Sequence, residues 1–321
     1  METLHIGISS NDAYATHLCT SIYSLFYNID RKFFVNLYVF DWWISDINKE
    51  KIIWSCNSFE NKTIFFIPMN KAFFNAFYTK WLSEETYFKL QIPEMDIFKN
   101  IKNFLFVDTD TMFHWDISTI FSIDLWDKLF WAVPYLWRWM VDYHEKMGTS
   151  LDNKYFNAGV LLMNLDLMRK NNFTQRIFEF LKNNHVNSFA YDEWALNKLF
   201  YTNWKEIPPK YNALPLLFCS ISYVFSGYTR EQYLEAKNKP VIVHFSWSTK
   251  PRNSLFPHPF KKEYFKYQSQ TYFKDSKFKK ILTTKSILKI AFYFFVANMP
   301  IWLYKLMFHK MKNWMKRLLN F

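Results

Sequence analysis

Glycine is scarce in this chain of 321 residues, with four copies at positions 7, 148, 159 and 227. Neither the G-x-G-x-x-G fingerprint of dinucleotide-binding proteins nor the P-loop motif can be written from glycines at those positions. The two common glycine-rich loops that hold phosphate groups are therefore excluded. A phosphate bound here has to be neutralised by a cation, and a metal ion fits this composition.

Cysteine is also rare: Cys19, Cys56 and Cys219 are widely spaced and odd in number. They provide neither a disulfide framework nor a cysteine-based zinc site. The first residues lack a basic segment followed by a long apolar one, so they are interpreted as a strand rather than a signal peptide. We therefore expect a reducing, cytoplasmic setting.

Acidic residues are absent from residues 276–321, which contain 10 Lys or Arg. The preceding 275 residues have 30 basic and 28 acidic side chains, so the net charge of +12 belongs mostly to the C-terminal segment. A near-neutral body argues against a nucleic-acid-binding protein, and no nucleic-acid partner is expected. The change in composition predicts a body over 1–275 and a basic tail over 276–321.

The tail also lacks a hydrophobic run long enough to span a bilayer. Its longest uncharged stretch, IAFYFFVANMPIWLY, has 15 residues, which is about 22 Å of helix against a hydrocarbon core of roughly 30 Å. Beyond Pro300, the pattern predicts an amphipathic helix lying in the interface of an anionic membrane. A helix packed on the body with a solvated basic face remains the alternative. The two predicted faces are Leu303, Met307, Met311, Trp314, Met315 and Leu318, and Lys305, His309, Lys312, Lys316 and Asn320.

The body alternates between short apolar or β-branched runs and segments of helical periodicity. Strands are predicted over 4–9, 33–40, 63–67, 104–107, 130–134, 158–165 and 241–245, and helices over 16–26, 47–56, 84–99, 166–184 and 191–200. Pro93 is expected to break or kink the third helix. This alternation is typical of an α/β fold with a mostly parallel sheet covered on both faces. Ligands of such sheets bind at the carboxyl ends of strands.

Asp108-Thr109-Asp110 follows the apolar run Phe104-Leu-Phe-Val at one such end. Two carboxylates two residues apart can point into one cleft, where they suit Mg²⁺ or Mn²⁺ bridging a diphosphate. The D-x-D pattern alone is weak, and a solvated strand end is the alternative.

Three later segments add to this pattern. Tyr155-Phe-Asn157-Ala158-Gly159 is interpreted as a tight polar turn before a buried strand, and Asp192-Glu193 opens a predicted helix. Val243-His244 ends a predicted strand six residues before Lys250. A simple turn, favourable charge at a helix N-terminus and a structural histidine are the plainer interpretations. A late histidine joining two aspartates is nevertheless a sound Mn²⁺ site.

In this order the segments resemble retaining glycosyltransferases of family 8, the group that contains bacterial lipopolysaccharide galactosyl- and glucosyltransferases and glycogenin. The resemblance covers roughly residues 4–252. It rests on D-x-D, on F-x-N-A-G-V-L-L-x-N-L and on H-F-x(4)-K-P. It implies a GT-A fold in one Rossmann-like catalytic domain, with UDP-glucose or UDP-galactose as donor. It also implies Mn²⁺ as the cation, with Mg²⁺ as the alternative.

The resemblance also implies roles for single residues. Asp108, Asp110 and His244 would be metal ligands, and Thr109 between the aspartates would line the donor site. Ser9, Ser10, Asn11 and Asp12 would hold uracil and ribose. Lys89 would lie near the donor phosphates and sugar, Lys250 would pair with the diphosphate, and Asn157 and Ala158 would hold the sugar. Asp192 would contact the sugar hydroxyls, and Glu193 would face the anomeric carbon.

Some positions depart from the family pattern. Asn11 and Ala13 replace the usual Asp and Asn of the first turn, which affects the expected base contacts. Glu193 stands where many members have Gln. Trp247 and Arg252 replace a usual Gly and Trp near the diphosphate.

The predicted function is therefore a retaining, Mn²⁺-dependent transfer of glucose or galactose from a UDP-sugar to a lipopolysaccharide or lipooligosaccharide acceptor, with an α-linkage. It would take place at the inner face of the cytoplasmic membrane, with the acceptor pocket including residues 135–155. The alternatives are a protein or capsule acceptor, and a degenerate relative that binds a nucleotide sugar or the membrane without transfer. A glycosyl-enzyme route through Glu193 and a same-face route both remain open.

Overall fold

The structure is a computed structural model that describes residues 1–70, 84–125, 127–135, 154–184, 191–246, 249–251, 256–276 and 284–299. A seven-stranded sheet forms its centre, with strand order β3-β2-β1-β4-β7-β6-β8. Its strands are β1 (Glu2–Asn11), β2 (Phe33–Trp42), β3 (Lys62–Pro68), β4 (Asn103–Asp108), β6 (Phe130–Tyr135), β7 (Tyr155–Asn164) and β8 (Trp204–Glu206).

The first half of the sheet is parallel, since β1 pairs in parallel with both β2 and β4, and β2 does so with β3. Strand β7 then runs antiparallel to both β4 and β6. The start of β7 therefore meets the carboxyl end of β4. This mixed, mostly parallel α/β sheet confirms the predicted fold class.

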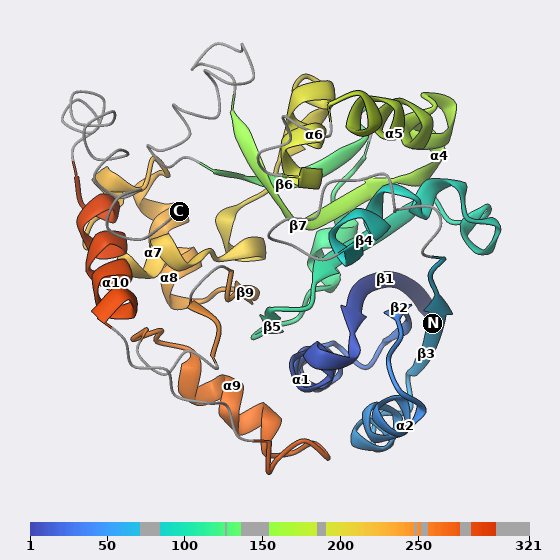
Figure 1. The fold of residues 1–321 in the computed structure, drawn as a ribbon, viewed down its shortest axis with the longest axis horizontal. Helices are drawn as coiled ribbons and strands as arrows, with labels where there is room; N and C mark the ends of the chain where they lie inside the picture. The colour runs from blue at the N-terminus through green and yellow to red at the C-terminus, as the bar shows by residue number, and fades with distance from the viewer. Residues whose placement is uncertain are drawn as a thin grey trace.

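Helices cover both faces of the sheet (Figure 1). Rings and aliphatic side chains from α1 and α2 pack on one face, and α4, α5 and α6 pack on the other. These helices are α1 (Ala15–Asn28), α2 (Asp46–Ser55), α4 (Leu165–Lys170), α5 (Phe173–Asn183) and α6 (Tyr191–Phe200). Burial on both faces explains why the central parts of β2, β4 and β7, residues 37–40, 104–107 and 160–163, are continuous apolar runs rather than alternating ones.

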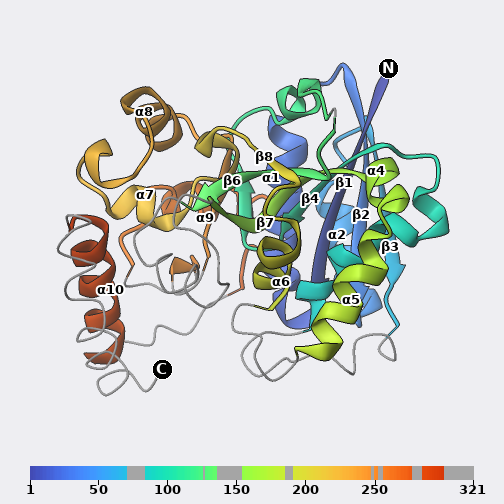
Figure 2. The same ribbon diagram turned by 90° about the horizontal axis from the view of Figure 1, so that it is seen from above.

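A second, smaller layer contains β5 and the elements that follow β8. Strands β5 (Thr111–Phe113) and β9 (Ile242–His244) form a two-stranded antiparallel sheet beside the main one. The helices around it are α7 (Pro215–Cys219), α8 (Arg230–Asn238), α9 (Lys261–Gln268) and α10 (Thr284–Ala297). In both views α10 lies beside α7, at the end of the molecule away from α5 (Figures 1 and 2).

Three predicted elements differ from the structure. Residues 84–99 form three short 3-10 helices instead of one α-helix: Glu84–Leu90, Ile92–Glu94 and Asp96–Phe98. Pro93 lies in the second of them and cannot supply the backbone N–H that a continuous helix needs. The helix predicted over 166–184 is two helices, α4 and α5, because Asn172 between them takes a left-handed conformation with φ of 49°.

The third difference concerns residues 155–159, which are the first half of strand β7 and not a turn. The polar Asn157 is 6% exposed inside this strand. Similarly, β1 continues through Ser9, Ser10 and Asn11, and the turn that follows is the 3-10 helix Asp12–Tyr14.

The start of the basic tail packs on the body. Ala297 and Met299 are buried, and the Asn298 amide donates to the carbonyl of Cys219 at 3.0 Å and accepts from the N–H of Ile221 at 2.7 Å. The amphipathic helix predicted beyond Pro300 lies outside the described residues. Within the described ranges, no helix combines the length and apolar character that crossing a bilayer requires.

Candidate active site

The D-x-D motif lies where β4 leaves the sheet. Asp108 ends the strand opposite Ser9 of β1, and the Thr109 hydroxyl donates to the carbonyl of Ser9. The chain then turns back into β5, because the Thr111 hydroxyl donates to the carbonyl of Asp108 at 2.8 Å. This tight connection places Asp110 between the large sheet and the small one.

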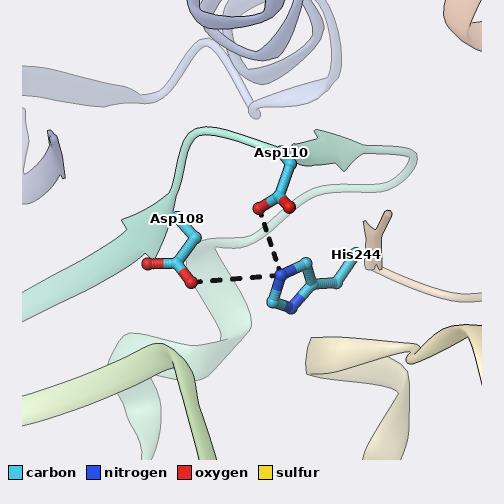
Figure 3. A group of neighbouring side chains, drawn as sticks. All are labelled: Asp108, Asp110 and His244. Atoms are coloured by element: carbon cyan, nitrogen blue, oxygen red, sulfur yellow. Dashed lines mark ion pairs between the residues drawn. The ribbon is translucent and has the colours of Figure 1, made fainter. Parts of the chain in front are cut away.

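The small sheet brings His244 to the aspartates. Thr111 at the start of β5 pairs with His244 at the end of β9, and the N–H of Phe245 donates to the carbonyl of Asp110 at 2.8 Å. The imidazole Nε2 lies 3.2 Å from Asp110 Oδ1 and 4.0 Å from Asp108 Oδ2 (Figure 3). The three ligand atoms lie within 4.8 Å of one another, so the predicted set of Asp108, Asp110 and His244 comes together in space.

Gly159 leaves room for this cluster. A Cβ built on Gly159 would press on the His244 ring and lie 2.8 Å from Asp108 Oδ2. Strand β7 therefore passes directly beside the cluster, and glycine is required there for close approach rather than for a turn.

Lys89 is buried beside the cluster, with 2% of its side chain exposed. Its ammonium lies 2.9 Å from Asp192 Oδ2 and 3.3 Å from Asp108 Oδ1, and donates to the carbonyl of Ala158 at 3.0 Å. These three acceptors match the three N–H donors of an ammonium group. The lysine thus joins β4, β7 and α6 at one point.

Asp192 and Glu193 at the start of α6 have different surroundings. Asp192 is 4% exposed and also accepts a hydrogen bond from the Thr86 hydroxyl at 2.5 Å. Glu193 Oε2 accepts from the Asn157 amide at 2.8 Å and from the N–H of Ala158 at 3.0 Å. Predicted catalytic and sugar-binding residues are therefore in mutual contact.

Lys250 connects the cluster to the first turn of the fold. Its ammonium lies 3.5 Å from Asp110 Oδ2, 3.1 Å from the Tyr14 hydroxyl and 4.7 Å from the centre of the Tyr14 ring. Lys250 is the side chain that the family resemblance assigns to the diphosphate.

The residues expected to hold the base lie at the same edge of the sheet but make different contacts. Ser9 and Ser10 are buried, and Asn11 Oδ1 accepts from the N–H of Tyr14 at 3.1 Å as a helix cap. Asp12 is exposed, and its Oδ1 accepts hydrogen bonds from the backbone and hydroxyl of Ser45 at the N-terminus of α2, both at 2.8 Å. Both Asn11 and Asp12 therefore fix the local backbone.

Charge and burial together change the pKa values in the site. Burial alone raises the pKa of Asp110, but the positive charges of Lys250 and His244 lower it below its ordinary value. Burial and Lys250 lower the pKa of His244, but the carboxylates of Asp110 and Asp108 outweigh them and raise it. Burial raises the pKa of Glu193 from 4.5 to about 7, and the N–H of Ala158 only partly offsets this. Asp108 and Asp192 raise the pKa of Lys89 against the effect of its burial, so Lys89 is charged.

Sequence reasoning missed Asn212. Its amide donates to Asn157 Oδ1 at 2.7 Å, and its Oδ1 lies 2.9 Å from His244 Nδ1. It ends the 3-10 helix Pro209–Asn212, in a stretch with no periodic pattern, and the neighbouring prolines were the one available signal of a fixed turn. Thr86 was missed as well, because its position in the segment 84–99, predicted as one helix, does not indicate contact with Asp192. Trp247, Arg252 and most of the predicted acceptor segment 135–155 lie outside the described residues.

Comparison with known proteins identifies relatives of this chain in sequence and in fold. A sequence relative, "General stress protein A" of Bacillus subtilis, is 30% identical over 277 residues, which are 84% of this chain and 94% of the relative. A "Putative glycosyltransferase" of Haemophilus influenzae is 28% identical over 67% of this chain and 64% of its own length. The fold is similar to that of the galactosyltransferase LgtC, solved with donor and acceptor sugar analogs. The TM-score is 0.69 at 22% identity, over 84% of this chain and 96% of that chain.

A second solved structure, the bifunctional glycosyltransferase WbbM, has a TM-score of 0.69 at 20% identity, over 85% of this chain and half of that one. These likenesses support the GT-A fold. Residues 5–255, most of the chain, match the sequence profile "Glycosyl transferase family 8". The chain therefore belongs to glycosyltransferase family 8, whose GT-A members use a metal and a nucleotide sugar.

Proposed function

We propose that this protein is a retaining, UDP-hexose-dependent glycosyltransferase that uses Mn²⁺ to move glucose or galactose to an acceptor hydroxyl. The observation that carries the proposal is the Asp108–Asp110–His244 cluster at the carboxyl edge of the parallel strands. Two carboxylates and an imidazole suit Mn²⁺, with Mg²⁺ as the alternative.

The residues around the cluster fit such an ion. Asn212 occupies Nδ1 of His244, which leaves Nε2 as the ligand atom facing the two carboxylates. Gly159 keeps space beside it. When bound, the ion would neutralise the charge that develops on the diphosphate leaving group, which is usually the largest electrostatic contribution.

The chain's own residues then have distinct tasks. Lys250 lies beside Asp110 and can neutralise a diphosphate oxygen. The edge formed by Ser9, Ser10, Asn11 and Asp12, with Thr109, would receive the nucleoside, and Asn157, Ala158 and Asp192 would orient the sugar. Lys89 is paired with Asp192, so it fixes that carboxylate and reaches donor groups through it.

Two mechanisms would retain the configuration at the anomeric carbon and give an α-linked product. They differ in whether Glu193 acts as the nucleophile. In the first, its carboxylate forms a bond to the anomeric carbon as the C–O bond to UDP breaks. The acceptor hydroxyl then displaces the carboxylate and passes its proton to a phosphate oxygen of the UDP. In the second, the acceptor hydroxyl attacks from the side of the leaving group and passes its proton to a phosphate oxygen of UDP. The hydrogen bonds from Asn157 and Ala158 hold this carboxylate in place for either role.

A donor screen tests the proposal directly. UDP-glucose and UDP-galactose are offered with Mn²⁺ and with EDTA, and sugar transfer and UDP release are measured. We expect turnover of one donor with Mn²⁺ and none with EDTA. Turnover in EDTA equal to that in Mn²⁺ would show that the reaction does not require a metal ion. Tight UDP-sugar binding without turnover would support the alternative of a non-catalytic relative.

Glu193→Gln should change the pH dependence of both stability and activity. The Glu193 pKa is raised from 4.5 to about 7, so its ionisation is disfavoured in the folded state, and this group lowers stability as pH rises through that window. We expect the metal-free wild type to lose on the order of 1–3 kcal/mol of unfolding free energy there relative to the variant. Urea unfolding at several pH values measures this difference.

The same variant separates the two routes. Some remaining transfer by Glu193→Gln is expected if the acceptor attacks directly, because an amide preserves the contacts of the site. Complete loss with intact UDP binding would favour the glycosyl-enzyme. An identical pH profile of stability in the two proteins would show that Glu193 does not carry the raised pKa.

For the acceptor we propose a lipopolysaccharide or lipooligosaccharide at the inner face of the cytoplasmic membrane, with the protein bound peripherally through its basic tail. The composition of residues 276–321 supports this, since anionic lipid attracts each basic side chain. A protein or capsule acceptor is the second candidate, because family membership leaves the acceptor class open.

Removal of residues 300–321, which contain five of the ten basic residues of the tail and the predicted amphipathic helix, should strongly weaken binding to vesicles that contain anionic lipid, while donor turnover remains. Each of the basic side chains removed contributes about 1 kcal/mol near an anionic surface. The cut is placed after Met299 because Ala297 and Met299 are buried on the body. Cosedimentation measures binding, with neutral phosphatidylcholine vesicles as the control. Unchanged partitioning of the shortened protein would refute anchoring by this segment.

A further inference from the structure

A continuous chain of hydrogen bonds joins His244 to Glu193. His244 Nδ1 lies 2.9 Å from Asn212 Oδ1, and Asn212 Nδ2 donates to Asn157 Oδ1 at 2.7 Å. Asn157 Nδ2 then donates to Glu193 Oε2 at 2.8 Å. Two amides thus connect the candidate metal ligand on β9 with the carboxylate on α6.

The direction of every bond in this chain is fixed. Glu193 Oε2 also faces the N–H of Ala158 at 3.0 Å, and Asn157 Oδ1 also accepts the N–H of Gly159 at 3.1 Å. A backbone N–H can only donate, so Asn157 must point its oxygen at Asn212 and its nitrogen at Glu193. Asn212 must therefore turn its oxygen to His244, which requires a proton on Nδ1.

The backbone holds Asn212 in this place. The neighbouring Ala213 donates to the carbonyl of Ile242 at 2.8 Å and accepts from the N–H of His244 at 3.1 Å. The Asn212 side chain is 1% exposed, His244 2% and Asn157 6%, so water does not compete for these bonds. Buried amides whose oxygen and nitrogen each have a partner of fixed polarity have one low-energy arrangement.

We propose that Asn212 is a positioning residue with two roles: it sets the His244 ring with its Nε2 lone pair toward Asp108 and Asp110, and through Asn157 it orients the Glu193 carboxylate. The inference rests on the proposed function, since it concerns the same metal and sugar site. It adds that the metal site and the sugar site are coupled, because a substitution at Asn212 affects both His244 and Glu193.

The two roles can be separated by substitution. In Asn212→Asp, a carboxylate oxygen still accepts from His244 Nδ1, but the donor to Asn157 Oδ1 is lost. We expect the Mn²⁺ dissociation constant of the metal-stripped full-length protein to stay within about threefold of wild type, because carboxylates serve this role for many metal-bound histidines. Turnover at saturating Mn²⁺ should fall by about tenfold or more, the usual effect of one lost buried hydrogen bond.

In Asn212→Leu both bonds are lost. We expect Mn²⁺ affinity to weaken by about 10- to 100-fold, as for other residues that orient a ligating histidine. Electron paramagnetic resonance of free Mn²⁺ measures affinity without any catalytic step, and single-turnover transfer measures the chemistry. If the leucine variant does not fold, the aspartate variant still tests the proposal, because its Mn²⁺ affinity should stay near that of the wild type while its turnover falls.

Asn197 provides a matched control. It is also 1% exposed, and its amide bonds the backbone of Phe156 and Glu193 without lying on the path to His244. Asn197→Asp should lower the free energy of unfolding without a selective change in Mn²⁺ affinity. The positioning role is refuted if both Asn212 variants bind Mn²⁺ like wild type, or if the aspartate variant loses as much affinity as the leucine variant. Wild-type protein that neither binds Mn²⁺ nor turns over UDP-sugar would instead refute the proposed function.

Discussion

Asp110→Asn should reduce sugar transfer by about 10³-fold or more at saturating Mn²⁺, because the charge stabilisation supplied by a bound cation is several kcal/mol. Asp110 Oδ1 lies 3.2 Å from His244 Nε2, and its Oδ2 lies 3.5 Å from the Lys250 ammonium. The asparagine side chain in this variant has nearly the same shape as the Asp110 carboxylate but no negative charge. Its NH₂ group would face a cation. Asp110→Ala should abolish transfer as well.

The measurement is single-turnover transfer over a titration of Mn²⁺, which separates weaker metal binding from a slower reaction. Asp127→Asn is the matched control: its carboxylate is 80% exposed before β6, and we expect wild-type rates. Urea unfolding checks that the Asp110 variants remain folded. Wild-type turnover by either Asp110 variant would show that the metal assignment is wrong.

Lys89→Met should destabilise the fold by about 3–5 kcal/mol, because it removes the partner of a buried carboxylate while leaving that carboxylate in place. The side chains of Lys89 and Asp192 are 2% and 5% exposed, and the Lys89 ammonium lies 2.9 Å from Asp192 Oδ2. Asp108 and the Ala158 carbonyl lose the same donor. Methionine has a similar length and fills the space, so the effect reports charge and hydrogen bonding rather than a cavity.

A double variant, Lys89→Met with Asp192→Asn, tests this cause. Neutralising the stranded carboxylate should recover part of the lost stability, and the double-mutant cycle gives the coupling energy. Lys210→Met is the control, since its partner Glu235 is 41% exposed, and such a pair contributes less than about 1 kcal/mol. Equal losses in the Lys89 and Lys210 variants would show that burial of the Lys89 pair has no special energetic effect.

The fold could be predicted from the sequence because its strands are buried on both faces. The run 104–107 is apolar throughout and is followed by a polar segment, and the run 33–40 is interrupted only by Asn36. The site's central residues could be predicted for a related reason: Asp108 and Asp110 directly follow such a run, and parallel strands gather their carboxyl ends at one edge. His244 was added by resemblance, and the pairing of β5 with β9 confirms its place beside the aspartates.

The remaining features depend on tertiary packing that has no local pattern. Asn157 and Gly159 are typical of turns, yet they lie in a buried strand. Glu193 and Asn212 form hydrogen bonds with the Asn157 amide, and the candidate metal ligands Asp108 and His244 leave no room for a side chain at position 159. Asn212 belongs to neither a strand nor an amphipathic helix. Its function follows from partners on β7 and β9, which are distant in the sequence.

The short β5–β9 sheet has a consequence for biosynthesis. Asp110 is translated long before His244, and the three residue pairs of this sheet are what bring them together. The nascent chain can complete the large parallel half of its sheet with two of the three candidate ligands and still lack the third. If the cluster holds a cation as proposed, high-affinity capture is expected only after the ribosome has released the segment around Ile242–His244, so that a partly made chain does not hold a competent catalyst.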